Sequence, residues 1–345
     1  ATRPVRARTY AYDPVSKTEV VTDRYFDDHG RENTASVTDG TYPGSNGVVR
    51  HRGVTIGTET VEVGGTITLG ANAEKSFGLR NKASGSITLV NGGKVVVQGE
   101  KNYGALSNGD PYQRQVKKAA NAYYTGVQEI AKIDINQGAT IEVTGKQSIG
   151  YAMLQGTGIN AGKIDVEGPT TNTATPAAYN GSIGFYGEKG TFTNTGTIKT
   201  SGNLAHAVVV KNPGMKFEHY GTIDVNSPAG TASDPGTPGN IGVFSDGNAT
   251  VNFKDNSNVF VGKNSIGIYS EDKAKFNDTF KNHGTLNIKI DENSTFAYLD
   301  GSATTTLKEF FNLNPAKVTI VENMGANSSL VYANNQAKAL LDADY

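Results

Sequence analysis

One short segment recurs along the chain and constrains the fold more than any other feature. Its fullest copy, Asn264–Ser270, reads Asn-Ser-Ile-Gly-Ile-Tyr-Ser, and the small residue at the centre of each copy recurs at steps of 23 to 46 residues. The centres of the other copies are Gly78, Gly104, Gly150, Gly184, Ala207, Gly242 and Ala297. Because so short a unit cannot bury an apolar face alone, the recurrence predicts an array of stacked units.

A second pattern, Gly-x-Ile-x-apolar, alternates with the first. Its copies are Gly65–Leu69, Gly85–Leu89, Gly162–Val166, Gly196–Thr200, Gly221–Val225 and Gly284–Ile288, with Ala139–Val143 a close variant. Apolar and polar residues alternate with period two, which indicates short strands with one buried face. Stacked parallel strands would place Ile164, Ile198 and Ile223 in one interior row, with Gly and Asn at the corners. The sequence therefore predicts an all-β fold, a right-handed parallel β-helix of about nine rungs.

The repeat divides the chain into three parts. We expect a polar N-terminal cap over residues 1–53, the β-helix over 54–300, and a C-terminal cap or further passenger sequence over 301–345. Within the last part, the pattern predicts a short helix around Leu307, Phe310 and Phe311, a strand at Val318–Val321 and a second helical segment at Ala337–Leu341. Three insertions interrupt the β-helix, at 110–134, 168–181 and 226–240.

The first insertion is predicted to be a helix. Pro111 can open a helix, and Val116, Ala119, Ala120 and Tyr123 fall at helical spacing. Such a helix would either pack across the rod or protrude from it as a recognition element. The other two insertions are rich in Thr, Pro, Gly and Ala, and both follow a Gly-x-Ile strand. We expect them to leave one edge of the rod two rungs apart, as recognition loops or as surface loops without a partner.

Composition excludes several classes of function. The formal net charge is -1 without a block of like charges, so neither nucleic acid nor an anionic membrane surface is an expected partner. No apolar run is long enough to span a membrane, so we expect no direct membrane insertion by this segment. Cysteine is absent, which removes disulfides and thiolate chemistry. We expect a monomer without a cofactor or metal.

The residues that could carry chemistry are the outward ones of the Gly-x-Ile strands. These are Thr68, Thr88, Glu142, Asp165, Lys199, Asp224 and Asn287. Glu142 and Asp165 on successive rungs could lie about 5 Å apart, near the separation in a retaining glycosidase. Lys199 would then follow Asp165, so a charge-balanced ladder is the simpler interpretation. We therefore predict no catalytic residues and no enzymatic activity.

Two pairs of segments carry a family resemblance. Asn264–Ser270 with Asn282–Ile288, and Ser182–Tyr186 with Asn194–Ile198, resemble the passenger repeats of classical, monomeric type V autotransporter adhesins, most closely the large fusobacterial outer-membrane adhesins. The resemblance covers about residues 54–300. It implies a β-helical virulence factor displayed at the bacterial cell surface, as the extracellular passenger of an outer-membrane protein. It also implies adhesion to a host cell-surface receptor or glycan, or to another bacterium.

The candidate binding residues lie in the insertions. In 110–134 they are Tyr112, Arg114, Tyr123 and Tyr124, and in the two loops they are Thr171, Tyr179, Asp234 and Pro235. Tyr and Arg residues often dominate the energetics of interfaces. Two alternatives remain open at this point. A β-helical polysaccharide lyase or hydrolase would show a deep acidic groove with Lys or Arg at its centre, and a structural stalk would bind no ligand of its own.

Overall fold

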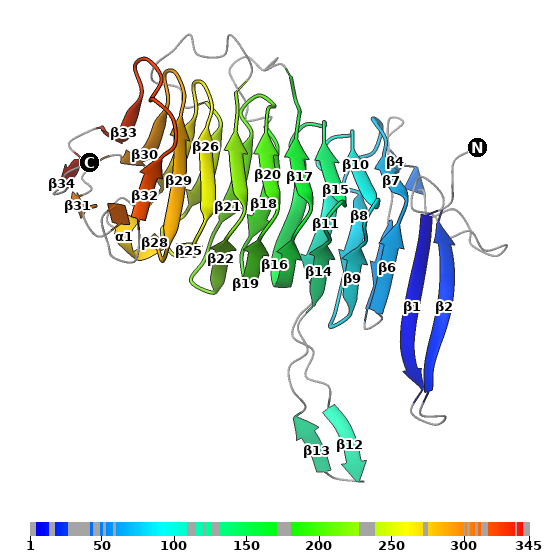
Figure 1. Cartoon of the computed structure of the whole chain (residues 1–345). Coiled ribbons are helices and arrows are strands. Elements are labelled where there is room, and N and C mark those ends of the chain that lie inside the picture. Colours follow the sequence, from blue (N-terminus) through cyan, green and yellow to red (C-terminus); the bar gives the residue numbers. More distant parts are fainter. Residues whose placement is uncertain are drawn as a thin grey trace.

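Successive turns of the chain stack into a rod whose strands lie in three columns (Figure 1). The computed structural model describes residues 5–13, 18–26, 42–43, 49–50, 53–57, 60–108, 115–119, 122–125, 131–170, 181–227, 239–271, 275–299, 301, 304–307, 310–311, 317–334 and 337–340. Each complete turn adds one strand to the first column, then one to the second and one to the third. We number the columns in this order.

The first column contains the strands of the Ile-Gly segments. They are β5 (Val54–Ile56), β8 (Phe77–Asn81), β11 (Tyr103–Asn108), the first half of β16 (Ile149–Asn160), β18 (Ile183–Gly187), β21 (His206–Val210), β24 (Ile241–Ser245), β27 (Ile266–Ser270), β30 (Thr295–Leu299) and β33 (Ser329–Ala333). The second column contains β6 (Thr60–Gly64), β9 (Ser86–Leu89), β14 (Lys132–Ile135), the second half of β16, β19 (Gly190–Asn194), β22 (Met215–His219), β25 (Thr250–Phe253) and β28 (Phe280–Asn282). Because β16 runs through both columns, they belong to one sheet, which has 19 strands when β1 (Val5–Asp13) and β2 (Thr18–Phe26) are included.

The third column is a 9-stranded sheet in which every neighbouring pair is parallel. Its strands are β7 (Thr66–Leu69), β10 (Lys94–Val97), β15 (Thr140–Val143), β17 (Lys163–Val166), β20 (Thr197–Thr200), β23 (Thr222–Val225), β26 (Ser257–Val261), β29 (Thr285–Ile290) and β32 (Lys317–Ile320). One strand for each turn gives nine rungs, as the sequence predicts. The predicted parallel β-helix is confirmed.

The remaining elements lie outside the regular coil. β1 (Val5–Asp13) and β2 (Thr18–Phe26) form an antiparallel pair, and β1 also pairs antiparallel with β6 of the first rung. This pairing covers the exposed edge of the second column at its N-terminal end. The others are β3 (Tyr42–Pro43) with β4 (Val49–Arg50), the short helix α1 (Phe276–Thr279), and β31 (Thr304–Thr306) with β34 (Lys338–Leu340).

The prediction of an inserted helix over 110–134 is wrong. The insertion contains β12 (Gln115–Ala119) and β13 (Ala122–Thr125), which pair antiparallel with Val116 opposite Tyr124 and Lys117 opposite Tyr123. β-Branched and aromatic residues favour strands, and here they outweigh the helical spacing of the alanines. The hairpin stands away from the rungs, at the bottom of the view in Figure 1.

The prediction for the C-terminal segment is partly wrong. Lys338–Leu340 is a strand paired with β31, and not a helical segment. The helical turn near Phe311 is present, because its backbone N–H donates to the carbonyl of Leu307 at 3.0 Å. The predicted strand at Val318–Val321 is β32, which pairs with β29 and continues the third column beyond residue 300.

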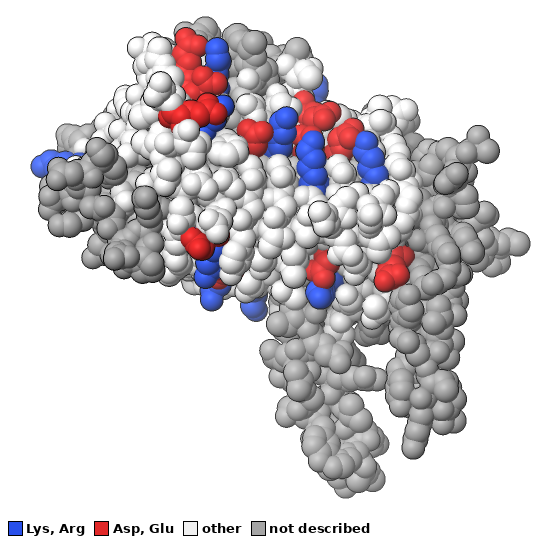
Figure 2. Space-filling model, in the orientation of Figure 1, with Lys and Arg blue, Asp and Glu red and all other residues white. Residues whose placement is uncertain are grey.

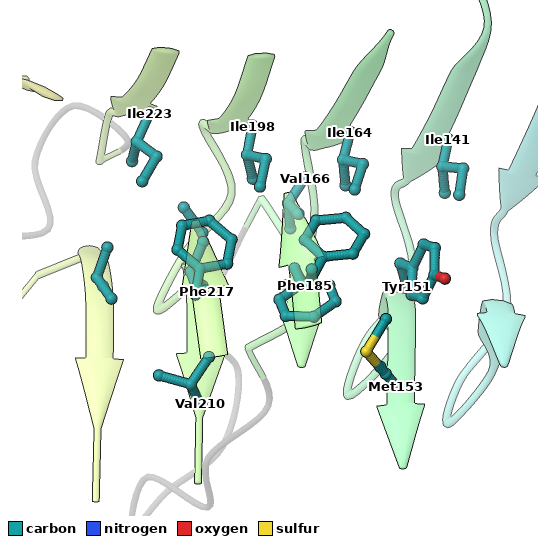
Figure 3. Packing of buried hydrophobic residues seen from close by; sticks show 14 of the residues in the cluster. Ile141, Tyr151, Met153, Ile164, Val166, Phe185, Ile198, Val210, Phe217 and Ile223 are labelled. Atoms are coloured by element: carbon teal, nitrogen blue, oxygen red, sulfur yellow. The ribbon is translucent and has the colours of Figure 1, made fainter. Parts of the chain in front are cut away.

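Aliphatic and aromatic side chains fill the interior in rows. Ile164, Ile198 and Ile223 are register partners on successive rungs and are fully buried, as predicted. Figure 3 shows this row facing the rings of Phe185 and Phe217 across the interior. Burial of each such side chain stabilises the fold by about 1.5–3 kcal/mol. The fold therefore depends on repeated apolar rows in place of one compact core.

The small polar residues of the Ile-Gly segments have structural roles at the turn into the first column. Ser148 Oγ accepts from the Asn102 N–H at 3.1 Å, and Ser182 Oγ accepts from the Ser148 N–H at 3.1 Å. These buried bonds satisfy backbone groups at a corner where the strand ladder is interrupted. At Gly150 a Cβ would lie 2.7 Å from the carbonyl oxygen of Gly184 and 2.9 Å from Ile164 Cγ2, so the close approach of rungs requires glycine.

A buried polar row follows the turn between the second and third columns. Asn160 Nδ2 donates to Asn194 Oδ1 at 2.8 Å, and Asn194 Nδ2 lies 3.2 Å from His219 Nδ1. His219 Nε2 lies 2.9 Å from the carbonyl oxygen of Asn258. These contacts fit a neutral imidazole that accepts at Nδ1 and donates at Nε2. Burial lowers the pKa of His219 to about 4, which keeps the ring neutral.

Candidate binding surfaces

The outward side of the third column, here the third face, carries a ladder of charged residues. Its successive register partners are Thr68, Val96, Glu142, Asp165, Lys199, Asp224, Phe260 and Lys289. Figure 2 shows charged side chains of both signs following one another across the upper part of this view. The stacking of Glu142 on Asp165, and of Lys199 between Asp165 and Asp224, is as predicted.

Two of the seven residues expected in this ladder lie elsewhere. Thr88 lies in β9 of the second column, where it pairs with Asp134. Asn287 pairs with Asn258, one outward position before Phe260 and Lys289. For Thr88 the reason is that any strand with one buried face shows the same alternation, so the pattern cannot assign the column. Asn287 does lie in the third column, but two residues before the position in register with Phe260.

Each carboxylate of the possible catalytic pair has a lysine partner. Glu142 Oε2 lies 2.7 Å from Lys94 Nζ, and Asp165, which is only 4% exposed, forms an ion pair with Lys163. Burial, followed by the charges of Asp165 and Glu142, raises the pKa of the neighbouring Glu167 carboxyl. The arrangement is a charge-balanced ladder in which lysines already occupy both carboxylates.

The outward side of the first column, here the first face, carries aromatic rings instead of ion pairs. His206, Phe244, Tyr269, Tyr298 and Tyr332 form a continuous row with centroid separations of 6.1, 5.4, 5.6 and 5.4 Å. Rings at these separations attract one another beyond their buried area. Tyr332 is 47% exposed, and the Tyr298 hydroxyl accepts from Asn334 Nδ2 at 3.1 Å.

The aromatic row is not among the predicted binding residues. The available signal was an aromatic residue two positions after the glycine in three of the Ile-Gly segments, namely Tyr186, Phe244 and Tyr269. Period two places that residue on the face opposite to its buried neighbour. The predicted binding residues all lie in the insertions, whereas this row belongs to the coil itself.

The structure places two of the eight predicted binding residues. Tyr123 and Tyr124 are neighbours in β13 of the inserted hairpin. The other six lie outside the described residues, namely Tyr112, Arg114, Thr171, Tyr179, Asp234 and Pro235. The insertions at 168–181 and 226–240 both connect the third column to the first, after β17 and after β23. One strand, β20, separates these two strands in the sheet, which agrees with the expected shared edge and two-rung separation.

Neither a metal cluster nor a membrane-spanning helix is found in the part of the chain that the structure describes. There, no group of three or more His, Cys, Asp and Glu side chains could hold a metal ion. In the same residues, no helix has the length and apolar character needed to cross a membrane.

Rungs of three parallel strands, an apolar interior and a turn lined with buried Asn define a parallel β-helix of the pectate lyase-like kind. Residues 29–254 match the family described as BigA third pectate lyase-like domain, and the chain belongs to this family. No curated protein and no solved structure matches the chain. The family supports the coarser part of the resemblance, a passenger-type β-helix of a surface adhesin.

Proposed function

We propose that this chain is part of the extracellular passenger of a type V autotransporter adhesin, related to the fusobacterial outer-membrane adhesins. On this proposal it is displayed at the outer membrane as a virulence factor. It binds a host cell-surface receptor or glycan, or another bacterium, without an enzymatic step. The family match and the β-helical rod support this function, because a long rigid rod holds binding loops away from the cell that carries it.

The observation that carries the proposal is the inserted hairpin. Other turns connect the first column to the second with few residues, as from Asn81 of β8 to Ser86 of β9. The coil therefore does not need β12 and β13, which form a two-stranded sheet of their own. Tyr123 and Tyr124 would supply rigid, amphipathic contact area at low entropic cost. Tyr112 and Arg114, with Thr171, Tyr179, Asp234 and Pro235 of the loops, complete the proposed contact.

The test replaces both hairpin tyrosines and measures adhesion. The variant Tyr123→Ala with Tyr124→Ala should bind host cells about tenfold more weakly or worse, because each anchor of this kind contributes on the order of 1–2 kcal/mol. Tyr220→Ala is the matched control, because Tyr220 is 46% exposed and lies in the rod. Undiminished adhesion by a folded double variant would contradict the hairpin as the contact.

A second experiment separates the adhesin from a stalk. Replacing residues 110–130 by a turn of the Asn81–Ser86 type should leave the rod folded and abolish cell binding. If the shortened protein still binds cells fully, the hairpin has no role in adhesion. Repeating the assay after enzymatic removal of host glycans distinguishes a glycan from a protein receptor.

A further inference from the structure

The last strands of the first column, β24, β27, β30 and β33, form the uncharged part of the first face. None of the residues in these four strands is charged. The register partners that they turn outward are Phe244, Tyr269, Tyr298 and Tyr332. On the third face, by contrast, β15, β17, β20 and β23 each turn a charged residue outward, namely Glu142, Asp165, Lys199 and Asp224. A ligand of the uncharged part would therefore be recognised by shape and hydrogen bonding, and not by ionic attraction.

The rings of this row are spaced too widely to cover one another's faces completely. Inside the rod, Phe185 and Phe192 are in face contact, with their centroids 3.8 Å apart. In the outward row the centroid separations are 5.4, 5.6 and 5.4 Å, close to the rise of about 4.8 Å for one rung. Phe244, Tyr269 and Tyr298 are partly exposed, and Tyr332 is 47% exposed. The surface thus offers one accessible ring for each rung, at a regular spacing.

Neutral hydrogen-bonding groups lie beside the last two rings. Thr295 and Ser329 are carried by the same two strands as Tyr298 and Tyr332, and their hydroxyl oxygens are 2.8 Å apart. The Tyr298 hydroxyl accepts from Asn334 Nδ2 at 3.1 Å, which fixes the position of its oxygen. A hydroxyl has one donor and two acceptor sites, so each has capacity for a further bond. We name the following residues the neutral strip: Phe244, Tyr269, Thr295, Tyr298, Ser329, Tyr332 and Asn334.

The charged residues that border the first face favour neither sign. They lie in the turns that follow first-column strands, where the described carboxylates are Glu188, Asp246 and Glu271 and the described lysines are Lys189, Lys211 and Lys275. The Asp246 carboxylate already accepts from the N–H groups of Asn212 at 2.9 Å and Asn248 at 2.8 Å. A border of balanced charge gives no net attraction for a charged polymer. Neither a basic peptide nor an acidic polysaccharide is therefore the expected ligand.

We propose that the neutral strip binds a linear, neutral oligosaccharide that lies along the rod, with one pyranose unit for each ring. The faces of a pyranose carry C–H groups that pack against an aromatic ring, and its edges carry hydroxyls that can bond to Thr295, Ser329 and Asn334. One rung rises by a length similar to that of one sugar unit in an extended chain, so successive units and rings stay in register. An apolar helix or a lipid chain would leave these hydroxyl and amide groups without partners. The inference rests on the proposed adhesin function and adds a glycan-binding surface separate from the hairpin.

The experiment measures the binding of chitotetraose and cellotetraose to the full chain by isothermal titration calorimetry. Tyr332→Ala removes the most exposed ring and should weaken sugar binding about fivefold. Tyr298→Ala should weaken it about tenfold, whereas Tyr298→Phe keeps the ring and should weaken it only about threefold. Tyr220→Ala is the matched control, because Tyr220 is 46% exposed and lies outside the strip, and it should leave the affinity unchanged.

The length and the charge of the ligand sharpen the test. Affinity should rise from chitobiose to chitotetraose, because the longer chain reaches more rings. It should be the same at low and high salt, because a neutral ligand forms no ion pair that salt could screen.

Three results would overturn the inference. One is that neither tetrasaccharide binds at millimolar concentration. A second is equal weakening by Tyr332→Ala and Tyr220→Ala, since binding would then not depend on the strip. The third is tighter, salt-sensitive binding of a heparin-derived oligosaccharide or of an oligoarginine peptide that Tyr332→Ala weakens. The hairpin variant Tyr123→Ala with Tyr124→Ala should keep its sugar affinity while it loses cell adhesion, so failure of the proposed function and failure of this inference are distinguishable.

Discussion

The interior and the surface of each rung come from the same strands and obey different constraints. In β20, Ile198 is fully buried between Ile164 and Ile223, while its neighbour Lys199 faces outward between two aspartates. The interior rows repeat one kind of residue, but the outward rows differ, with ion pairs on the third face and aromatic rings on the first. The comparison teaches that coiling fixes the inward residues and leaves the outward ones free to carry recognition.

The sharpest test of this contrast is a pair of substitutions in β20. Ile198→Ala should lower the free energy of unfolding by about 4 kcal/mol, because it removes a fully buried side chain and leaves a cavity between rungs. Lys199→Ala, one residue along, should change it by about 0.5 kcal/mol or less. Urea unfolding followed by circular dichroism measures both. Similar losses in the two variants would show that inward and outward positions are not distinguished as described.

Acid should destabilise the interior through His219. The pKa is about 4 in the folded chain and about 6.5 when unfolded, so the unfolded state binds more protons between these values. The stabilisation is complete above about pH 6.5 and is lost as the pH falls towards 4, by up to about 3 kcal/mol. Protonation at Nδ1 would also oppose the amide of Asn194.

His219→Asn provides the check on this prediction, because asparagine keeps an amide in the polar row and cannot titrate. The loss of stability between about pH 7 and pH 4.5 should shrink by about half. It should not vanish, because burial also lowers the pKa of His206 to about 4. An unchanged pH profile of the unfolding midpoint would remove His219 as the source.

Substitution by alanine should change the stability differently at two glycines, because neighbouring rungs approach closely at Gly150 and not at Gly70. Gly150→Ala should cost about 2 kcal/mol, since the new Cβ would meet the Gly184 carbonyl oxygen at 2.7 Å. Gly70→Ala meets nothing within 4 Å, so it should be neutral or slightly stabilising. Thermal unfolding of the two variants makes the comparison, and equal melting temperatures would contradict the role of Gly150.

The sequence predicted those parts of the structure for which a residue pattern had a single physical cause. Ile164, Ile198 and Ile223 could be placed because burial and period two both required the same row. Thr88 could not be assigned to a column, since strands of two columns share one alternation. The segment around Val116 and Tyr123 also has helical spacing. It forms strands because its two halves pair with each other, and such pairing cannot be read from the spacing alone. The aromatic row depends on stacking across rungs, which needs the register of every rung at once.

The smallest effect is expected on the third face, and it tests whether the ladder there is structural. Glu142→Gln removes the charge that pairs with Lys94 at 2.7 Å, where both side chains are partly exposed, at 24% and 39%. The loss of stability should be about 0.5 kcal/mol at low salt and less at high salt, because solvent and ions screen the pair. Val96→Thr, at the adjacent ladder position, is the uncharged control and should show no salt dependence.

A loss of several kcal/mol that persists in salt would mean that the outward ladder supports the coil as strongly as the interior does. The division between fixed interior and free surface would then fail for the third face, and the aromatic row would have to be tested for the same structural role.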